Sequence, residues 1–373
     1  MNSLFFELIR VAIGTQTGLS RLPSEAEWEE LFDVAVKQSL VGICYVGLTN
    51  LGADSDDGFA KIGMSKDLFL EWMGLAAQIN MKNDVVNEQC ATLQKQLAAY
   101  GFRSSILKGQ AVAMLYGEEL RCFRQSGDID IYVDCGREKA IEYARSVQGD
   151  VDWDYKHLHL KVFDDTEVEM HYVPEVLLNL RKNRKLQKWF KEPEVQSSMF
   201  RNSAGSGTVP SEDFVCPSVE FNLFYILLHT YRHFLYEGVG MRQLMDYCFV
   251  LRSDEVDEPM RQRVLKTITL FGLTRFASGV MWIMKDVFGM SEHLLLCAQD
   301  EKEGRYILNE VMTGGNFGHH DERLADDNTY GKMRAIKKIL KHNLHLLTHY
   351  PADALWAPVW IVYHWCWKRL HRI

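Results

Sequence analysis

The chain has 373 residues, of which 47% are hydrophobic, 25% charged and 12% aromatic. These proportions are typical of a folded globular protein, and they exclude a disordered chain, a collagen-like repeat and a small disulfide-stapled protein. The net charge is −8, from 42 basic and 50 acidic residues, which argues against a uniformly basic nucleic-acid-binding protein. At roughly 150 residues per domain, the length predicts two or three domains.

The charge is distributed unevenly. From residue 331 onward there are eight basic residues and one acid, Asp353, so this tail carries +7 and residues 1–330 carry −15. Its last part, Trp356 to Arg372, mixes aromatic and basic side chains. This pattern predicts a helix that packs its Trp and Tyr rings on the domain and presents Lys and Arg outward. Alternatively, the tail binds a polyanion such as tRNA or attaches the chain to a membrane surface.

The cysteines and the hydrophobic stretches indicate a cytoplasmic protein. The eight cysteines are scattered and form no C-x-x-C motif, as in a reduced compartment. Near the N-terminus, Glu7 and Arg10 interrupt the apolar run, which predicts an amphipathic helix instead of a signal peptide. The most hydrophobic stretch, residues 352–367, is shorter than the roughly 20 apolar residues of a spanning helix. We therefore expect no transmembrane segment.

Residues 1–100 are predicted to be helical. Ser24 is a plausible N-cap before a stripe of apolar residues at helical spacing, which consists of Trp28, Leu31, Phe32 and Ala35. Residues 65–100 contain no proline and a single glycine, so we expect one or two long helices there.

The sequence pattern changes from helical to strand-like after residue 100. Short strands are predicted at 103–108, 129–133, 157–163 and 167–172, with a helix at 137–147, and residues 164–166 form a hairpin turn. The chain then becomes helical again from residue 217. The sequence thus predicts an α+β protein with four parts: a helical region (1–100), a core with a small mixed sheet (101–200), a linker or mobile loop (201–216) and a helical domain with the basic aromatic tail (217–373).

The strongest chemical signal is Gly127-Asp128-Ile129-Asp130-Ile131. On a strand, Asp128 and Asp130 point to the same face, and two carboxylates held side by side are unfavourable unless a cation or a proton lies between them. Mg²⁺ prefers carboxylates together with substrate phosphates. Alternatively, the two acids are simply the solvated face of a half-buried strand.

Two further segments strengthen the first interpretation. Leu107-Lys108-Gly109-Gln110 ends a strand and opens a helix, where backbone amides and the Lys108 ammonium can bind phosphate. Glu169 lies on a later strand, on the same face as Glu167 and His171. A pair of acids, a third acid and an anion-binding turn would suit two-metal phosphoryl transfer.

These motifs together resemble a known family. Lys108-Gly109, Arg124 four residues before Asp128-Ile-Asp-Ile, and Glu169-Met-His171 are similar to the uncharacterised nucleotidyltransferase family of the DNA polymerase β-like superfamily. The resemblance covers about residues 1–250 and includes the Leu- and His-rich segment 227–233 and Arg242 to Asp246. The superfamily more usually has Gly-Gly-Ser where this chain has Lys108-Gly109-Gln110.

The resemblance implies a role for each position. Two Mg²⁺ ions, replaceable by Mn²⁺, would be held by Asp128, Asp130 and Glu169, and Glu169 would also help to deprotonate the attacking hydroxyl. The β- and γ-phosphates of an NTP, expected to be ATP, would be bound by Lys108, Gly109 and Gln110. The remaining nucleotide-binding candidates are Arg124, which braces its loop or neutralises phosphate charge, and Arg242 and Asp246, which face the nucleotide if the helical domain closes over it.

Several assignments stay open at this point. Glu167 is an alternative to Glu169, and Arg242 and Asp246, one helical turn apart, are alternatively a simple ion pair. His157 and His159 are expected on the exposed face of a hairpin strand, and His171 near the site without being a metal ligand. His229 and His233 have the i, i+4 spacing of a zinc pair, but without a third ligand we favour packing.

The resemblance predicts transfer of a nucleoside monophosphate to a hydroxyl of a protein, a tRNA end or a small molecule, with release of pyrophosphate. The alternative is a non-catalytic nucleotide-binding regulatory module on the same fold.

Overall fold

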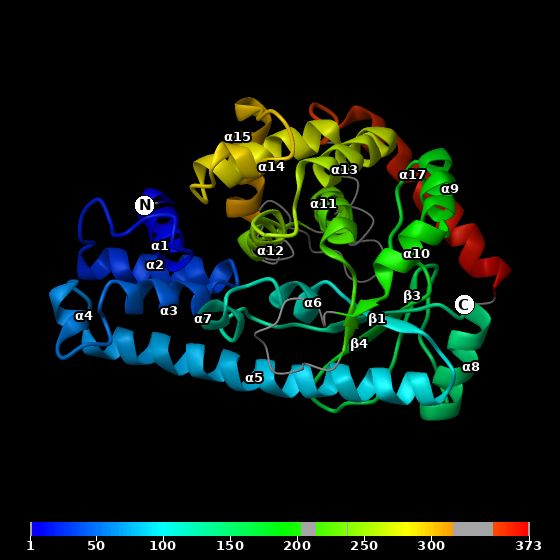
Figure 1. Ribbon diagram of the computed structural model, residues 1–373, viewed down its shortest axis with the longest axis horizontal. Helices are drawn as coiled ribbons and strands as arrows, with labels where there is room; N and C mark the ends of the chain where they lie inside the picture. The colour runs from blue at the N-terminus through cyan, green and yellow to red at the C-terminus, as the bar shows by residue number, and fades with distance from the viewer. Residues whose placement is uncertain (1, 203–213, 237, 316–345, 372–373) are drawn as a thin grey trace, which may run out of the picture. The chain divides into compact units, whose positions relative to one another are not determined.

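The computed structural model describes residues 2–202, 214–236, 238–315 and 346–371 (Figure 1). It confirms the predicted α+β class, with a small mixed sheet and helical regions on both sides of it in the sequence. Residues 203–213 of the predicted linker lie outside the described residues, as do six of the eight basic residues of the tail. The predicted domain boundaries stay a prediction.

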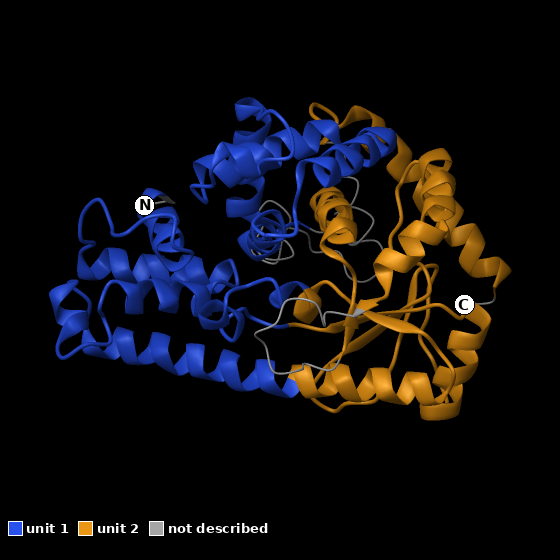
Figure 2. Ribbon diagram, viewed as in Figure 1, with its two compact units in different colours: residues 1–85, 112–126, 238–320 blue, residues 86–111, 127–237, 321–373 orange. Residues whose placement is uncertain are grey.

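The chain forms two compact units, each assembled from three separate segments (Figure 2). Unit 1 comprises residues 1–85, 112–126 and 238–320, and unit 2 comprises residues 86–111, 127–237 and 321–373. Residues 65–100 form one long helix, α5 (Lys66–Ala99), as one of the two predicted outcomes, and the division between the units falls within it.

The described part of unit 1 is helical. Besides the first part of α5 and the end of α6, it contains α1 (Asn2–Ala12), α2 (Glu25–Lys37), α3 (Val41–Asn50), α4 (Gly58–Lys61), α7 (Glu118–Arg121), α12 (Met241–Leu251), α13 (Glu258–Phe271), α14 (Thr274–Asp286), a 3₁₀ turn (Glu292–Leu294) and α15 (Glu301–Gly314).

Helix α2 begins where the sequence predicts. The Ser24 side chain accepts a hydrogen bond from the Glu27 backbone N–H, and the Glu27 carboxylate accepts one from the Ser24 N–H, which completes a capping box. The predicted apolar stripe from Trp28 to Ala35 is buried. The indole N–H of Trp28 donates to the carbonyl of Ile62 at 2.9 Å, so its one polar atom is satisfied inside the core.

Unit 2 contains the sheet. Its elements, besides the second part of α5, are β1 (Ser104–Leu107), α6 (Gly109–Ala113, in part), β2 (Ile129–Val133), α8 (Arg137–Gln148), β3 (His157–His159), β4 (Val168–His171), α9 (Leu180–Trp189), α10 (Pro193–Met199), β5 (Arg201–Asn202), β6 (Val215–Cys216), α11 (Val219–Tyr236) and α17 (Pro351–Leu370).

The four-stranded sheet has the order β1-β2-β4-β3. β1 and β2 are antiparallel, β2 and β4 are parallel, and β4 and β3 form the predicted antiparallel hairpin. The short strands β5 and β6, at the two ends of the predicted linker, pair with each other as a separate two-stranded sheet.

The two faces of the sheet differ in chemistry because side chains alternate along each strand. One row across all four strands is apolar and buried, and consists of Ile106, Ile131, Met170 and Leu158. The neighbouring row, on the opposite face, reads Leu107, Asp130, Glu169 and His159. The sheet therefore carries its acids and histidines on one face and a hydrophobic core on the other.

Helix α17 confirms part of the prediction for the tail. Trp360 and Trp367 pack edge-on against Tyr155, with ring centroids 5.7 and 5.3 Å away. Arg369 is exposed and stacks over Trp365. The outward side is not only basic, as predicted, but also apolar: the exposed side chains include Leu355, Val359, Val362, Trp365 and Leu370.

No helix in the described ranges is both long enough and apolar enough to cross a membrane.

Candidate functional site

Four of the predicted site residues meet on the polar face of the sheet. Asp130 on β2 and Glu169 on β4 are directly opposite each other in the parallel pairing. Asp128 immediately precedes β2 and lies two residues before Asp130 on the same face. Lys108 follows β1 directly and reaches the same place, with its Nζ 2.6 Å from Oδ1 of Asp130.

Asp130 is buried and compensated by two basic groups. Its Oδ1 lies 2.6 Å from Lys108 Nζ and 2.7 Å from Nε2 of His171, and the side chain is only 7% exposed. Burial opposes ionisation, but Lys108 and His171 outweigh it and hold the pKa of Asp130 well below its usual range. Asp130 is therefore a permanent anion at neutral pH.

Asp128 has the opposite electrostatic situation. The charge of neighbouring Asp130, followed by partial burial, raises the pKa of Asp128 to about 6. Its side chain stays exposed to solvent. The site thus contains one stable carboxylate and one whose charge is destabilised by its neighbour, and a bound cation would remove that repulsion.

Of the two candidate glutamates, the structure places Glu169 at the site. Its Oε2 lies 3.3 Å from Nε2 of His171, so the His171 nitrogen lies between Glu169 and Asp130. Burial opposes ionisation of Glu169, but hydrogen bonding to His171 lowers its pKa to about 2. Glu167 is exposed and precedes β4, where its carbonyl accepts a hydrogen bond from Ile129.

The turn after β1 has an unusual backbone. Lys108 has φ +49° and Gly109 has φ +35°, and both values lie in the left-handed region, which residues other than glycine rarely adopt. The helix that follows, α6, has five residues. Gln110 is buried, and its amide donates to Asn87 of α5. Its predicted contact with phosphate, like those of Lys108 and Gly109, stays a prediction.

The other three predicted nucleotide-binding residues lie in unit 1. Arg124 is buried and makes a two-bond ion pair with Asp246, with Nε–Oδ1 2.6 Å and Nη2–Oδ2 2.7 Å. Tyr116 donates a further hydrogen bond to Asp246, and Arg242 donates to the carbonyl of Gln125. This geometry favours the bracing role for Arg124, because it anchors the loop that precedes Asp128.

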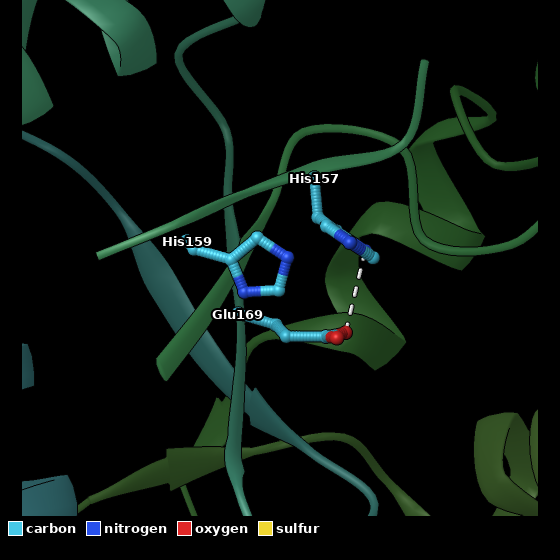
Figure 3. Close-up of side chains that lie close together, drawn as sticks. All are labelled: His157, His159 and Glu169. Atoms are coloured by element: carbon cyan, nitrogen blue, oxygen red, sulfur yellow. Dashed lines mark ion pairs between the residues drawn. The ribbon is translucent and has the colours of Figure 1, made fainter. Parts of the chain in front are cut away.

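The expectation for His157 and His159 is wrong. They are half-buried, not exposed, because β3 pairs with β4 and sets them beside Glu169 (Figure 3) and beside His171. Nδ1 of His157 lies 3.3 Å from Oε2 of Glu169. Burial, and then the proximity of His171, lower the pKa of His157 to about 4, so it is neutral at pH 7. The predicted hairpin, which pairs this strand with the one that carries Glu169 and His171, was the signal that could have found them.

A second buried acid, Glu175, was not singled out from the sequence. It is fully buried, and three basic side chains surround its carboxylate: His229 at 2.8 Å, Arg232 at 3.4 Å and Lys156 at 3.7 Å. Burial opposes ionisation, but Lys156 and Arg232 hold the pKa of Glu175 well below its usual range. His229 therefore has a structural partner, which agrees with the packing interpretation over a zinc pair.

The polar face has the donor set that a divalent cation requires. One ligand atom from each of Asp130, Glu169 and His171 lies within 4.8 Å of the others, and Asp128 adds a carboxylate whose charge Lys108 only partly compensates. Carboxylate oxygens suit Mg²⁺ and Mn²⁺. The residues on this face therefore fit the divalent cation that the sequence predicts, and its binding stays a prediction.

Comparison with known proteins identifies a family for the chain. The family described as "Uncharacterised nucleotidyltransferase" matches residues 24–289, more than two thirds of the chain. The chain belongs to this nucleotidyltransferase family. Its membership supports nucleotidyl transfer in general as the activity.

Other comparisons add less. A search of curated proteins found no match for this family member. Among solved structures, it is similar to the crystal structure of an antigenic nucleotidyltransferase-like protein from Paracoccidioides brasiliensis, with 13% sequence identity and a TM-score of 0.33. That similarity covers 60% of this chain and 97% of the other.

The repulsion at Asp128 predicts a pH-dependent stability effect in the metal-free nucleotidyltransferase family member. The native pKa of about 6 lies above the ordinary 3.8, so the ionised Asp128 carboxylate lowers the free energy of unfolding. This loss is absent below pH 4, where Asp128 is protonated in both states, and it develops as the pH rises through 6. Asp128→Asn should therefore raise the free energy of unfolding at pH 7.5 by about 1 kcal/mol, a value reduced by solvent screening at this exposed side chain. The gain should vanish near pH 4.

Urea unfolding with a chelator present measures this effect. Asp164→Asn, at an exposed acid in the β3–β4 turn, makes the same charge change and should show no such pH profile. An equal gain for both variants would contradict the repulsion between Asp128 and Asp130.

The Arg124–Asp246 pair predicts a large stability loss. Asp246→Asn leaves the buried Arg124 charge uncompensated and should lower the free energy of unfolding by about 3–5 kcal/mol. The matched control is Glu301→Gln, which breaks the exposed pair with Arg305 and should cost under about 1 kcal/mol. Equal losses in chemical denaturation would show that the buried pair does not anchor its loop.

Proposed function

We propose that the chain transfers a nucleoside monophosphate from an NTP, with ATP the expected donor, to a hydroxyl group of an acceptor in a Mg²⁺-dependent reaction. The acceptor oxygen forms a bond to the α-phosphorus, the bond from the α-phosphorus to the bridging oxygen of the β-phosphate breaks, the hydroxyl proton passes to water, and pyrophosphate is released. The observation that supports this best is the pairing of Asp130 with Glu169, with Asp128 on the same face.

In this proposal the three acids hold the cations. Mg²⁺ or Mn²⁺, when bound, would neutralise the triphosphate charge and polarise the phosphorus under attack. Asp130 and Glu169 have low pKa values and so present full negative charge, while Asp128 loses its repulsion from Asp130 when positive charge is near. The pKa of about 2 makes Glu169 better suited to cation binding than to accepting the hydroxyl proton.

In this proposal Lys108 has one role before the cation and the NTP bind and another role afterwards. In the described structure its ammonium compensates Asp130, together with His171. A divalent cation beside Asp130 would weaken that attraction, and Lys108 could then bind a phosphate oxygen of the NTP. The left-handed backbone at Lys108 and Gly109 turns the chain sharply between β1 and α6 and directs the Lys108 side chain to this face.

A basic surface on α9 supports a polyanionic acceptor such as tRNA. Arg181, Arg184, Lys185 and Lys188 have the spacing i, i+3, i+4, i+7 and are exposed along one side of the helix. None has an ion-pair partner within the ranges that the structure describes. The helix packs beside the Glu175 cluster, because Gln187 donates to the Glu175 carbonyl at 2.8 Å. This surface adds to the basic tail as a site for phosphate backbones.

Nucleotidyl transfer predicts labelled products that depend on the acids. Incubation of each α-labelled NTP with Mg²⁺ and a cell extract should give a labelled product with the wild type. Asp128→Asn and Asp130→Asn should lower its rate by about 100-fold or more, since each removes a ligand for the charge-stabilising cation.

The control for this assay is Asp164→Asn, which should leave the rate unchanged. Binding of the NTP by calorimetry without any labelled product or pyrophosphate, across protein, tRNA and small-molecule acceptors, would instead identify a non-catalytic nucleotide-binding module.

The α9 surface predicts salt-sensitive binding of tRNA. The double variant Arg184→Glu/Lys185→Glu should weaken binding of labelled tRNA and reduce the slope of log affinity against log salt by about 2. Lys139→Glu/Arg145→Glu reverses two exposed charges on α8 and should leave the slope unchanged. The same loss in both variants would show a general charge effect instead of an α9 surface.

A further inference from the structure

A second group of metal-ligating side chains lies next to the three acids. His157 and His159 project from β3 on the polar face, and Glu169 is directly opposite His159 on β4. One ligand atom from each lies within 4.8 Å of the others. Figure 3 shows the two imidazole rings and the carboxylate converging from the two strands.

The geometry is close to that of a formed metal site. Ligands that bind one ion at about 2.0–2.2 Å lie roughly 3–3.5 Å from each other in a tetrahedral arrangement. The distance of 3.3 Å between Nδ1 of His157 and Oε2 of Glu169 already meets this condition. The antiparallel pairing fixes the backbones of all three residues, and their ligand atoms already lie within 4.8 Å of one another.

Nδ1 of His157 takes part in no hydrogen bond among the described residues. This nitrogen is buried, although Glu169 is within ion-pair distance. Buried polar atoms are ordinarily satisfied, so an unbonded imidazole nitrogen aimed at a carboxylate indicates an absent ligand.

The donor types decide which metal fits. Imidazole nitrogen binds Zn²⁺ well, whereas Mg²⁺ prefers oxygen. Two histidines and one glutamate form a three-ligand zinc set with a further position open. We propose that His157, His159 and Glu169 form a Zn²⁺ site beside the Asp128–Asp130 carboxylates, with Glu169 shared between the two. This inference rests on the proposed function only through that shared residue.

Zinc binding to the metal-stripped full chain, measured without nucleotide, tests the site. In calorimetry, His157→Ala and His159→Ala should each lose one equivalent of Zn²⁺ or weaken it by about 100-fold. The control His293→Ala, which changes an exposed histidine of the 3₁₀ turn, should bind as the wild type does. Unchanged zinc stoichiometry and affinity in both histidine variants would overturn the proposal.

A second type of variant, in which one metal-ligating side chain replaces another, tests the site even if an alanine variant does not fold. His159→Cys places a thiolate at the same position, and titration with Co²⁺ as a probe should then produce a sulfur-to-cobalt charge-transfer band that the wild type lacks. A folded His159→Cys chain without this band would show that residue 159 is not a ligand. Failure of nucleotidyl transfer leaves both readouts intact, because neither uses an NTP.

Discussion

The register between β2 and β4 is the constraint on which the candidate site depends. Pairing Asp130 with Glu169 on one face also pairs Ile131 with Met170 on the other. Because side chains alternate, a slip of one residue would move carboxylates into the core and core residues to the polar face. Each buried apolar side chain contributes about 1.5–3 kcal/mol, so the hydrophobic row holds the acids in position. The chemistry of one face is thus secured by the packing of the other.

Three buried acids, two in unit 2 and one in unit 1, share one electrostatic feature: each has at least one basic partner in contact. Asp130 has Lys108 and His171, Glu175 has three basic neighbours, and Asp246 has Arg124. Burial of an ion costs several kcal/mol unless charge and hydrogen bonds compensate it. Asp128, which is exposed to solvent, differs from these three, because the charge of Asp130 raises its pKa and Lys108 only partly offsets the repulsion. The uncompensated charge marks the place on the sheet where added positive charge is most favourable.

Local patterns in the sequence predicted the elements well. The Ser24 cap, the strands around Asp130 and the β3–β4 hairpin depend on residues close together in the chain, and the structure confirms them. The strand order and the parallel pairing of β2 with β4 depend on contacts about 40 residues apart, which periodicity does not contain. For the same reason the sequence did not reveal that Glu175 would meet His229, or that Asp246 would pair with Arg124, 122 positions away. His157 and His159 were misplaced because a single strand's alternation does not say which neighbour covers its polar face.

The three-segment construction of each unit has a consequence for synthesis and dissection of the chain. Unit 1 combines residues 1–85 with residues 238–320. Its folding therefore cannot be completed during synthesis until this last segment has emerged from the ribosome. A contiguous fragment that contains unit 1 in full, residues 1–320, also includes most of unit 2, and a fragment that begins with unit 2 at residue 86 severs helix α5. Function in this chain is therefore better mapped by single substitutions than by truncation.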